Sequence, residues 1–225
     1  MPTSLILPAH NQESTIRKVI LDILAWIPNC EIIVVCNGCS DKTAEVARGL
    51  NNPNIVCLEL ANAKKGLAIM EGIKHAKFDF TGFVDTDGAF SGENVAGLLS
   101  HLNGSDCVMA SKWKGVRFQE VNESFGRKLM SRGWNLLVRL LLGLPFQDTQ
   151  AGLKVFKKSA YDSIRNDFIC KGFDFDVELL FKLKRAGYRI TEEFVATSKS
   201  VKTSFRLRHT VGMTWNPIKL ALWRF

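Results

Sequence analysis

The stretch Phe80–Gly88 reads FTGFVDTDG, an apolar-rich run that ends in two aspartates separated by a single residue. Phe80–Val84 predicts a buried strand, and Asp85 and Asp87 follow it directly. Two charges at the end of a buried strand need a partner, because burying an unpaired charge is costly. The pair suits one hard cation, Mg²⁺ or Mn²⁺, which prefers oxygen ligands. A solvated Asp-rich turn is the alternative interpretation of so short a motif.

The sequence before Phe80 alternates between strand and helix patterns. This β-α-β-α order predicts an α/β fold with a mostly parallel central sheet flanked by helices. Ligands of such sheets bind beyond the carboxyl ends of the strands. The expected strands are Ser4–Ala9, Glu31–Val35 and Ile55–Leu60, and the expected helices are Glu13–Trp26, Asp41–Leu50 and Lys64–Ala76. The polar strand ends are Pro8–Asn11, Cys36–Asp41 and Asp85–Gly88.

The sequence after Gly92 continues the α/β pattern with a longer helix. We expect helices at Glu93–Leu102, about Glu123 to Leu144, and Asp174–Ala186, and strands at Asp106–Ala110, Gly152–Lys157 and Arg189–Val195. In the long helix, Arg127, Lys128, Arg132 and Arg139 accompany an apolar stripe formed by Phe125, Leu129, Leu136, Leu137, Leu140, Leu141 and Leu144. Residues 1–208 are interpreted as one domain, and residues 209–225 as a basic, aromatic tail.

Composition indicates a globular protein that favours phosphates. The 225 residues are 46% hydrophobic and 23% charged, with a net charge of +8. From Thr197 to Phe225 the chain has six Lys or Arg and no Asp or Glu. This balance favours nucleotides, nucleic acid or an anionic membrane surface. No RNA-binding aromatic platform or helix-turn-helix is evident, so we expect no nucleic-acid partner.

Cysteine usage and the N-terminus favour a cytosolic location. No basic leader with an apolar core and cleavage site precedes Ser4, and a chain of this length needs no disulfide framework. We therefore expect six reduced thiols. Cys36-x-x-Cys39 lacks a second such pair, which disfavours zinc or redox chemistry. The longest apolar stretch, Trp134–Phe146, is interrupted by Arg139 and is too short to span a bilayer.

Two polar segments at strand ends offer groups for a nucleotide. Pro8–Glu13 (PAHNQE) leaves the first strand, and Asn11 can instead cap the following helix. Cys36–Thr43 (CNGCSDKT) leaves the second strand, where Asn37 suits a base edge and Ser40 or Asp41 can cap a helix. These helix caps are the structural alternative to a ligand-binding role.

In this order, the segments resemble the large inverting glycosyltransferase family with the GT-A fold. That family shows PAYNEE, DDGSxDxT, a Lys-Gly pair and DxD, which stand here as Pro8–Glu13, Cys36–Thr43, Lys65-Gly66 and Asp85–Asp87. The later segments SRG-NLL from Ser131, DTQAGLKVF from Asp148 and FDVEL from Phe175 resemble polyprenyl-phosphate (dolichyl-phosphate) mannosyl- and glucosyltransferases. The resemblance covers roughly residues 3 to 205.

The resemblance implies a role for each matching position. Asp85 and Asp87 would hold the metal and the diphosphate, with Asp87, Asp148 and Asp176 as the catalytic set. The nucleotide would contact Pro8, Ala9, His10, Gln12, Asn37, Lys65, Asp85 and Thr86. Gln150 and Glu178 would line the acceptor side, and Lys112, Arg127, Arg132 and Lys202 are candidates for phosphate contacts, with a solvated helix face as the alternative for these four.

Several positions depart from the family pattern. Cys36 and Asn37 replace the two acids of DDGS, His10 replaces the aromatic of PAYNEE, and Gln12 replaces its first Glu. The first acid of DDGS often reads the base, so its replacement leaves the choice of base open. Ala89 stands where relatives offer a polar neighbour of the metal, so an extra water is expected there.

The expected reaction transfers a hexose from a UDP- or GDP-sugar, with Mg²⁺ or Mn²⁺ and inversion, to a polyprenyl or dolichyl phosphate. A phosphate monoester is largely dianionic at neutral pH and needs no general base. Asp148 or Asp176 would be the base if the acceptor were a sugar or protein hydroxyl. A non-catalytic nucleotide-binding protein and a nucleotidyltransferase are further alternatives, and the latter lacks its Gly-rich loop at Pro8-Ala9-His10.

The tail offers a route to a lipid acceptor. Val211–Phe225 combines aromatic and aliphatic residues with Lys219 and Arg224 and has no acid. This composition suits an interfacial helix, and a helix packed on the core is the alternative. The sequence therefore predicts a protein at the cytoplasmic face of a membrane, held peripherally or through a membrane-protein partner.

Overall fold

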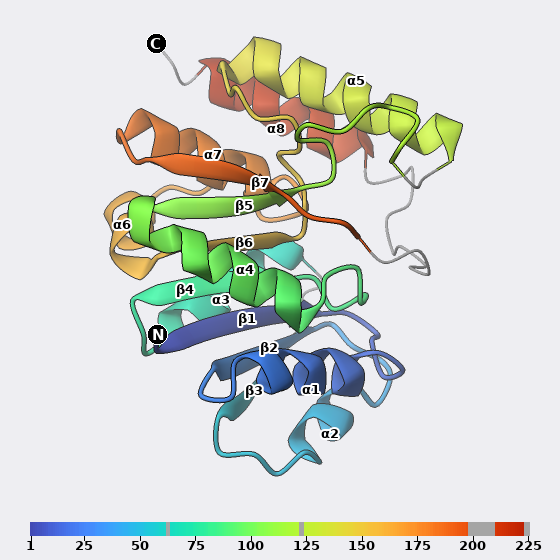
Figure 1. Cartoon of the computed structure of the whole chain (residues 1–225), viewed down its shortest axis with the longest axis vertical. Coiled ribbons are helices and arrows are strands. Elements are labelled where there is room, and N and C mark those ends of the chain that lie inside the picture. The colour runs from blue at the N-terminus through green and yellow to red at the C-terminus, as the bar shows by residue number, and fades with distance from the viewer. Residues whose placement is uncertain (62–63, 122–123, 198–209, 223–225) are drawn as a thin grey trace.

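The protein is built around one twisted sheet. The structure is a computed structural model that describes residues 1–61, 64–121, 124–197 and 210–222, with the backbone alone for Arg127 and residues 210–215. Within these residues one seven-stranded sheet has the order β3-β2-β1-β4-β6-β5-β7 (Figure 1). The strands are β1 (Thr3–Ala9), β2 (Glu31–Asn37), β3 (Ile55–Leu60), β4 (Phe80–Val84), β5 (Cys107–Ser111), β6 (Leu153–Lys157) and β7 (Ile190–Phe194).

The sheet is mostly parallel, as the sequence predicts. Strands β1, β2, β3 and β4 run parallel, and so do β5 and β7. Strand β6 runs antiparallel to both of its neighbours, β4 and β5. The strand order reverses between β1 and β4, the point at which ligands of open α/β sheets bind. The carboxyl ends of β1 and β4 are therefore the place where a ligand is expected, and we call this place the crevice.

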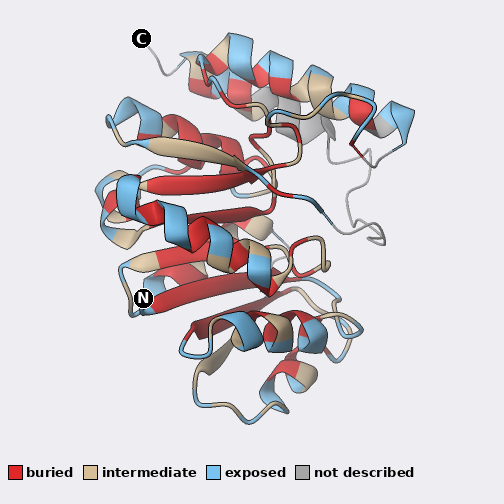
Figure 2. Ribbon diagram, viewed as in Figure 1, coloured by how far each residue is buried: buried red, intermediate tan, exposed pale blue. Residues whose placement is uncertain are grey.

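Helices cover both faces of the sheet. Helices α1, α2 and α4 pack on one face, and α3 and α7 on the other, with the buried strands between them (Figure 2). Helices α5 and α8 lie together beyond the β7 edge (Figure 1). The helices are α1 (Ile16–Trp26), α2 (Thr43–Arg48), α3 (Lys65–His75), α4 (Gly92–His101), α5 (Phe125–Leu142), α6 (Lys158–Ile164), α7 (Phe175–Arg185) and α8 (Thr210–Leu222), with a 3₁₀ turn at Leu102–Gly104.

The central strands are apolar on both sides because both faces are covered. Every residue of β1 and β2 is buried, which is typical of parallel strands between two helical layers. Side chains alternate between the faces. Ile6 and Ile33 pack toward α3 and α7, and Leu5 and Ile32 pack toward α1 and α4.

The apolar stripe predicted for the long helix does not face the core. Phe125, Leu129, Leu136 and Leu140 are 71%, 60%, 55% and 74% exposed, and Leu137 is also exposed. Only Leu141 and Leu144 of the predicted stripe pack against the core. The core-facing side is formed by Lys128, Asn135, Val138 and Leu142 instead. Periodicity alone cannot tell which of two apolar faces of a helix points inward.

The tail folds back on the domain. Helix α8 packs against α5 and α7, and its Leu220 is buried in the same cluster as Val138 and Leu142. Asn216 donates a hydrogen bond to Asp174 at the start of α7. Ile218 and Leu222 are exposed on the other side of the helix. Within the described residues, no helix combines the length and apolarity needed to cross a membrane.

Close approach of α3 to β1 gives a stability test. A Cβ placed on Gly72 would lie 2.5 Å from Ile6 Cγ2, whereas one on Gly97 of α4 would meet nothing within 4 Å. We expect Gly72→Ala to lower the free energy of unfolding by about 1–3 kcal/mol through overpacking. Gly97→Ala, the matched control, should raise it by up to ~1 kcal/mol through helix propensity. Urea unfolding of both variants measures this, and equal effects would contradict the packing of α3 on Ile6.

Candidate active site

Hydrogen bonds hold the loops after β1 and β4 together at the crevice. Thr86 Oγ1 donates to the carbonyl of Pro8 (3.1 Å), and Thr15 Oγ1 donates to the carbonyl of Thr86 (2.9 Å). Asn37 Nδ2, at the end of β2, donates to the carbonyl of Ala9 (2.9 Å). Pro8, Ala9, Thr86 and Asn37 are buried. The predicted nucleotide residues at the ends of three strands are thus brought together. The Thr86 hydroxyl holds the loop after β4 against the end of β1.

The loop between β1 and α1 is fixed against the loop after β2. His10 is exposed, and its Nδ1 lies 2.9 Å from the carbonyl oxygen of Asn37. The backbone amide of Gln12 donates to Thr43 Oγ1 (2.8 Å). Asn11 is not the predicted cap of the first helix, because α1 begins at Ile16. Its side-chain oxygen instead accepts the backbone N–H of Ser40 (2.8 Å).

The Asp85 carboxylate occupies a tight place between β4 and β6. Its Oδ1 lies 2.8 Å from Lys65 Nζ. A Cβ on Gly152 would overlap the same carboxylate, so glycine is required there. Burial raises the pKa of Asp85, and nearby Asp176 and Asp87 act in the same direction against Lys65. Asp87 is half-buried, and its Oδ1 accepts the backbone N–H of Ala89 (3.0 Å).

Behind Asp85 lies a buried network of alternating charges. Asp176 is 1% exposed and lies 3.3 Å from Lys65 Nζ and 2.6 Å from Lys154 Nζ. Burial opposes ionisation of Asp176, but the two ammonium groups outweigh it and hold its pKa below the usual range. Burial likewise opposes the charge of Lys65, and Asp176 and Asp85 outweigh it and raise its pKa. This setting makes Asp176 a weak base and a strong anchor for Lys65.

The loop before β6 carries the second candidate carboxylate. Asp148 is buried, and its Oδ2 accepts the backbone N–H of Lys112 (3.2 Å). Burial raises the pKa of Asp148, and Lys112 opposes the shift. The backbone amides of Gln147 and Asp148 donate to the carboxylate of Glu192 on β7 (2.8–3.0 Å). Asp148 is therefore the better-placed base of the two predicted alternatives.

The remaining residues predicted to contact the acceptor lie in different surroundings. Glu178 is fully buried, and its two oxygens accept the backbone amides of Ile169 and Cys170 (2.6–3.1 Å), so it holds the loop before α7. Its acceptor role stays a prediction. Gln150 Nε2 donates to the carbonyl of Phe173 (3.3 Å). The Arg132 guanidinium lies 4.3 Å from the ring centre of Trp113. Lys202 and the Arg127 side chain lie outside the described residues.

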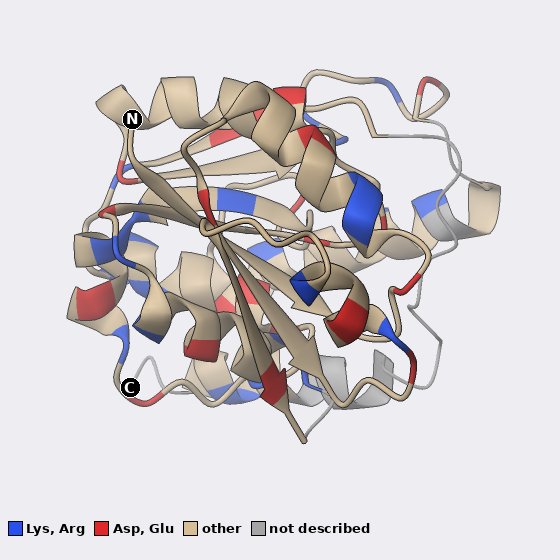
Figure 3. Ribbon diagram, turned by 90° about the horizontal axis from the view of Figure 1, so that it is seen from below, with Lys and Arg blue, Asp and Glu red and all other residues tan. Residues whose placement is uncertain are grey.

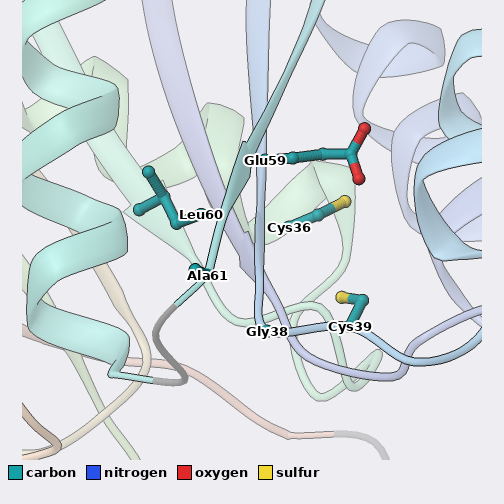
Figure 4. Close-up of a pocket in the computed structure, with 6 residues that line it drawn as sticks. All are labelled: Cys36, Gly38, Cys39, Glu59, Leu60 and Ala61. Atoms are coloured by element: carbon teal, nitrogen blue, oxygen red, sulfur yellow. The ribbon is translucent and has the colours of Figure 1, made fainter.

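A pocket of about 440 Å³ lies beside the ends of β2 and β3 (Figure 4). Figure 4 shows the side chains of Cys36, Cys39 and Glu59 on one side of these strands and Leu60 on the other. Hydrogen bonding from Cys36 is the main cause that lowers the pKa of Cys57 to about 7. All cysteines of the described chain are free thiols. The pocket thus has a thiol, Cys36, where the family pattern has an acid.

Asp85 and Asp87 fit a metal that is completed by its substrate. Within the described residues, no three His, Cys, Asp or Glu side chains come together as a metal site. Mg²⁺ is commonly held by only one or two carboxylates together with substrate phosphates. The two aspartates supply that donor set at the crevice, with Lys65 neutralising one oxygen of Asp85. Acidic and basic residues are interspersed along the helices, strands and loops of the fold (Figure 3).

Sequence reasoning missed three residues that shape the site. Lys154 and Glu192 lie within strands, where their charges break the apolar or alternating pattern. A charge inside a strand needs a partner, so this break in the pattern could have identified both residues as part of a charged site. Gly152, which makes room for Asp85, had no signal beyond its place before a strand.

Comparison with known proteins decides the family. Residues 4–165 match the family model of Glycosyl transferase family 2. The chain belongs to this family. The enzyme is therefore a glycosyltransferase, and the resemblance inferred from its motifs is confirmed.

Curated relatives of this glycosyltransferase share about a quarter of its residues. Glycosyltransferase AglD of Haloferax volcanii is 28% identical over 84% of the chain, which spans only 32% of that protein. The dolichyl-phosphate beta-glucosyltransferase of Drosophila melanogaster is 27% identical over 98% of the chain and 76% of its own length. The undecaprenyl-phosphate mannosyltransferase of Micrococcus luteus is 27% identical over 83% of the chain and 79% of its own length.

Solved structures confirm the GT-A fold. Glucosyl-3-phosphoglycerate synthase from Mycobacterium tuberculosis, in complex with Mn²⁺, UDP and glucosyl-3-phosphoglycerate, has a TM-score of 0.70 at 19% identity. The match covers 98% of this chain and 78% of that one. Mannosyl-3-phosphoglycerate synthase from Rubrobacter xylanophilus has a TM-score of 0.73 at 19% identity, over 100% and 73% of the two chains.

The charge network gives the family 2 site a pH signature. We expect Asp176→Asn to destabilise the fold by about 3–5 kcal/mol at neutral pH, because it leaves two buried ammonium groups with one carboxylate fewer. A carboxylate whose pKa is lower in the folded than in the unfolded protein stabilises the fold at pH values above its unfolded pKa of about 3.9. This stabilisation is lost as the pH falls through the pKa of the folded protein. The difference in the free energy of unfolding between the wild type and Asp176→Asn should therefore be largest at neutral pH and become smaller below about pH 4.

Urea unfolding of both proteins between neutral and acid pH measures this signature. Asp162→Asn is the control, because Asp162 on the surface of α6 pairs with Lys158 and Arg165. Its expected cost is about 0–1 kcal/mol. A deficit of Asp176→Asn that does not change with pH would contradict an ionised Asp176 in the network.

Proposed function

We propose that this glycosyltransferase moves a hexose from a UDP- or GDP-sugar to a polyprenyl or dolichyl phosphate, with inversion. The observation that carries the proposal is the Asp85–Asp87 pair at the crevice between β1 and β4, where Lys65 pairs with Asp85 and Gly152 makes room for it. The names of the relatives that act on dolichyl and undecaprenyl phosphate support the acceptor. Neighbours solved with UDP and Mn²⁺ or Mg²⁺ support the donor and the metal.

The donor would lie across the ends of β1, β2 and β4. Its base and ribose would contact Pro8, Ala9, His10 and Asn37, whose positions are locked by the hydrogen bonds between the loops. The diphosphate would face Asp85, Asp87 and Lys65. A bound Mg²⁺ or Mn²⁺ would neutralise the charge that develops on the leaving nucleoside diphosphate. Lys65 adds a positive charge held in place by Asp176.

The acceptor would approach from the loop before β6. An oxygen of its phosphate attacks the anomeric carbon while the bond from that carbon to the diphosphate oxygen breaks. Attack opposite the leaving group inverts the anomeric carbon. The attacking phosphate carries no proton that must be removed, since its second pKa is about 6. Lys112 and Arg132 would offset its charge, so positioning and electrostatics supply the catalysis.

A sugar or protein hydroxyl is the second candidate acceptor. It would need a general base, and the buried Asp148, whose pKa is raised, would take that role. A nucleotide-binding protein without activity is the third candidate, favoured by Cys36 at the position of a family acid. The lipid acceptor would place the enzyme peripherally at the cytoplasmic face of a membrane or beside a membrane-protein partner.

Transfer from radiolabelled UDP- and GDP-sugars to a short polyprenyl phosphate, with Mn²⁺ or Mg²⁺, tests the proposal. We expect labelled lipid from one donor, and its loss when EDTA removes the metal. Metal-dependent release of nucleoside diphosphate without labelled lipid would move the acceptor to a hydroxyl. No product from any donor would favour the binding protein.

Asp87→Ala should lower transfer by at least about a hundredfold and leave the fold intact, because Asp87 is half-buried in the loop after β4 and would support charge stabilisation of the leaving group. Glu45→Ala removes an exposed carboxylate from α2 and is the matched control. Initial rates and circular dichroism of both variants give the comparison. An unfolded Asp87→Ala protein would show that Asp87 is structural, and an active one would remove it from the site.

A further inference from the structure

Helix α5 carries a second apolar face that the domain leaves open. Phe125, Leu129, Leu136 and Leu140 follow one another along this face, and Met130 and Leu137 widen it; all six are exposed. The opposite side of the same helix is anchored by Val138 and Leu142. We call the six exposed residues the outer face of α5. A contiguous apolar face that stays exposed marks a site of contact with a protein or a membrane.

The charged residues on α5 and α8 have one sign. The α5 sequence contains three arginines and one lysine and no acidic residue. Arg139 is exposed, and Arg132 lies over Trp113 at the side of the helix. Helix α8, which packs beside α5, contains Lys219 and no acid, and it exposes Ile218 and Leu222. An apolar face bordered by basic residues alone is complementary to an anionic lipid surface.

The outer face is joined to the loop on which the acceptor would arrive. Asn135, on the inner side of α5, accepts hydrogen bonds from Thr149 N and Thr149 Oγ1 (3.0 Å each). Ser131 Oγ accepts from Trp113 Nε1 (3.1 Å), next to Lys112. The helix therefore holds Asp148–Gln150 on one side while its other side remains apolar and exposed. A surface that binds α5 would lie close to this loop.

We propose that the outer face of α5 is the membrane-contacting surface of this enzyme, seated on an anionic bilayer with the helix lying along it. The link from this surface to the acceptor rests on the proposed function, whereas the binding itself does not. The helix of 18 residues is about 27 Å long at 1.5 Å per residue, so it contacts many lipids without crossing the bilayer. The basic residues at its sides meet the headgroups.

Co-sedimentation of the full chain with vesicles tests the surface. The vesicles contain phosphatidylcholine alone or mixed with phosphatidylglycerol. We expect binding that is stronger with phosphatidylglycerol and weaker at high salt. The triple variant Leu129→Gln/Leu136→Gln/Leu140→Gln should bind at least about tenfold less, because three inserted side chains become polar. The control Leu21→Gln/Trp26→Gln changes exposed apolar residues of α1 and should bind like the wild type.

Arg139→Gln separates the electrostatic part, and it should weaken binding only on vesicles with phosphatidylglycerol. Circular dichroism and thermal melting check that each variant is folded. Equal binding of the triple variant and the wild type, or no binding by the wild type, would overturn the proposal. A wild type that is dimeric and a triple variant that is monomeric, with no vesicle binding by either, would assign the face to a second copy instead.

The same proteins distinguish this proposal from the proposed function. Transfer to a short polyprenyl phosphate in detergent should be unchanged in the triple variant, since the three substituted side chains are exposed on the side of α5 opposite Val138 and Leu142. Vesicle binding that depends on α5, without any transfer, would support the proposed membrane-contacting surface and contradict the proposed function. Transfer in detergent without vesicle binding would support the proposed function and contradict the proposed membrane-contacting surface.

Discussion

The structure depends on keeping four opposite charges together at the end of a buried sheet. Asp85 and Asp176 alternate with Lys65 and Lys154 in this network. Two of the four, Lys154 and Asp176, are almost inaccessible to water. Each group would be costly to bury alone, so the four are stable only as a set. The network joins α3, β4, β6 and α7, and it therefore fixes the crevice as well as the fold.

Much of the fold could be predicted because local pattern and tertiary environment agree in the central sheet. The run Phe80–Val84 reads as a strand and is one, and β3 has the predicted bounds. The α6 helix was not predicted, since seven residues carry too little periodicity. Which face of α5 points inward could not be predicted, because apolar residues lie on both sides of the helix and only the position of the sheet decides which of them are buried.

The site was predictable where it follows a strand end and less so where distant segments meet. Asp85, Asn37 and Pro8 come from the ends of parallel strands, whose carboxyl ends converge by topology. The partnership of Asp176 with Lys154 and Lys65 joins α7 to β6 and α3, and no local spacing encodes it. Glu178 matched a motif as well as Asp176 did, yet it holds backbone amides away from the crevice.

The reversed direction of β6 has a consequence for how such a site can change over evolution. Because β6 is antiparallel to β4, the segment that enters it, Asp148–Gly152, arrives at the same edge as the segments that leave β1, β2 and β4. The two groups of loops belong to different stretches of the gene, before and after residue 92. The later stretch can diverge while the earlier one is conserved. The loops that leave β1, β2 and β4 can thus be inherited unchanged by descendants in which the Asp148–Gly152 segment differs.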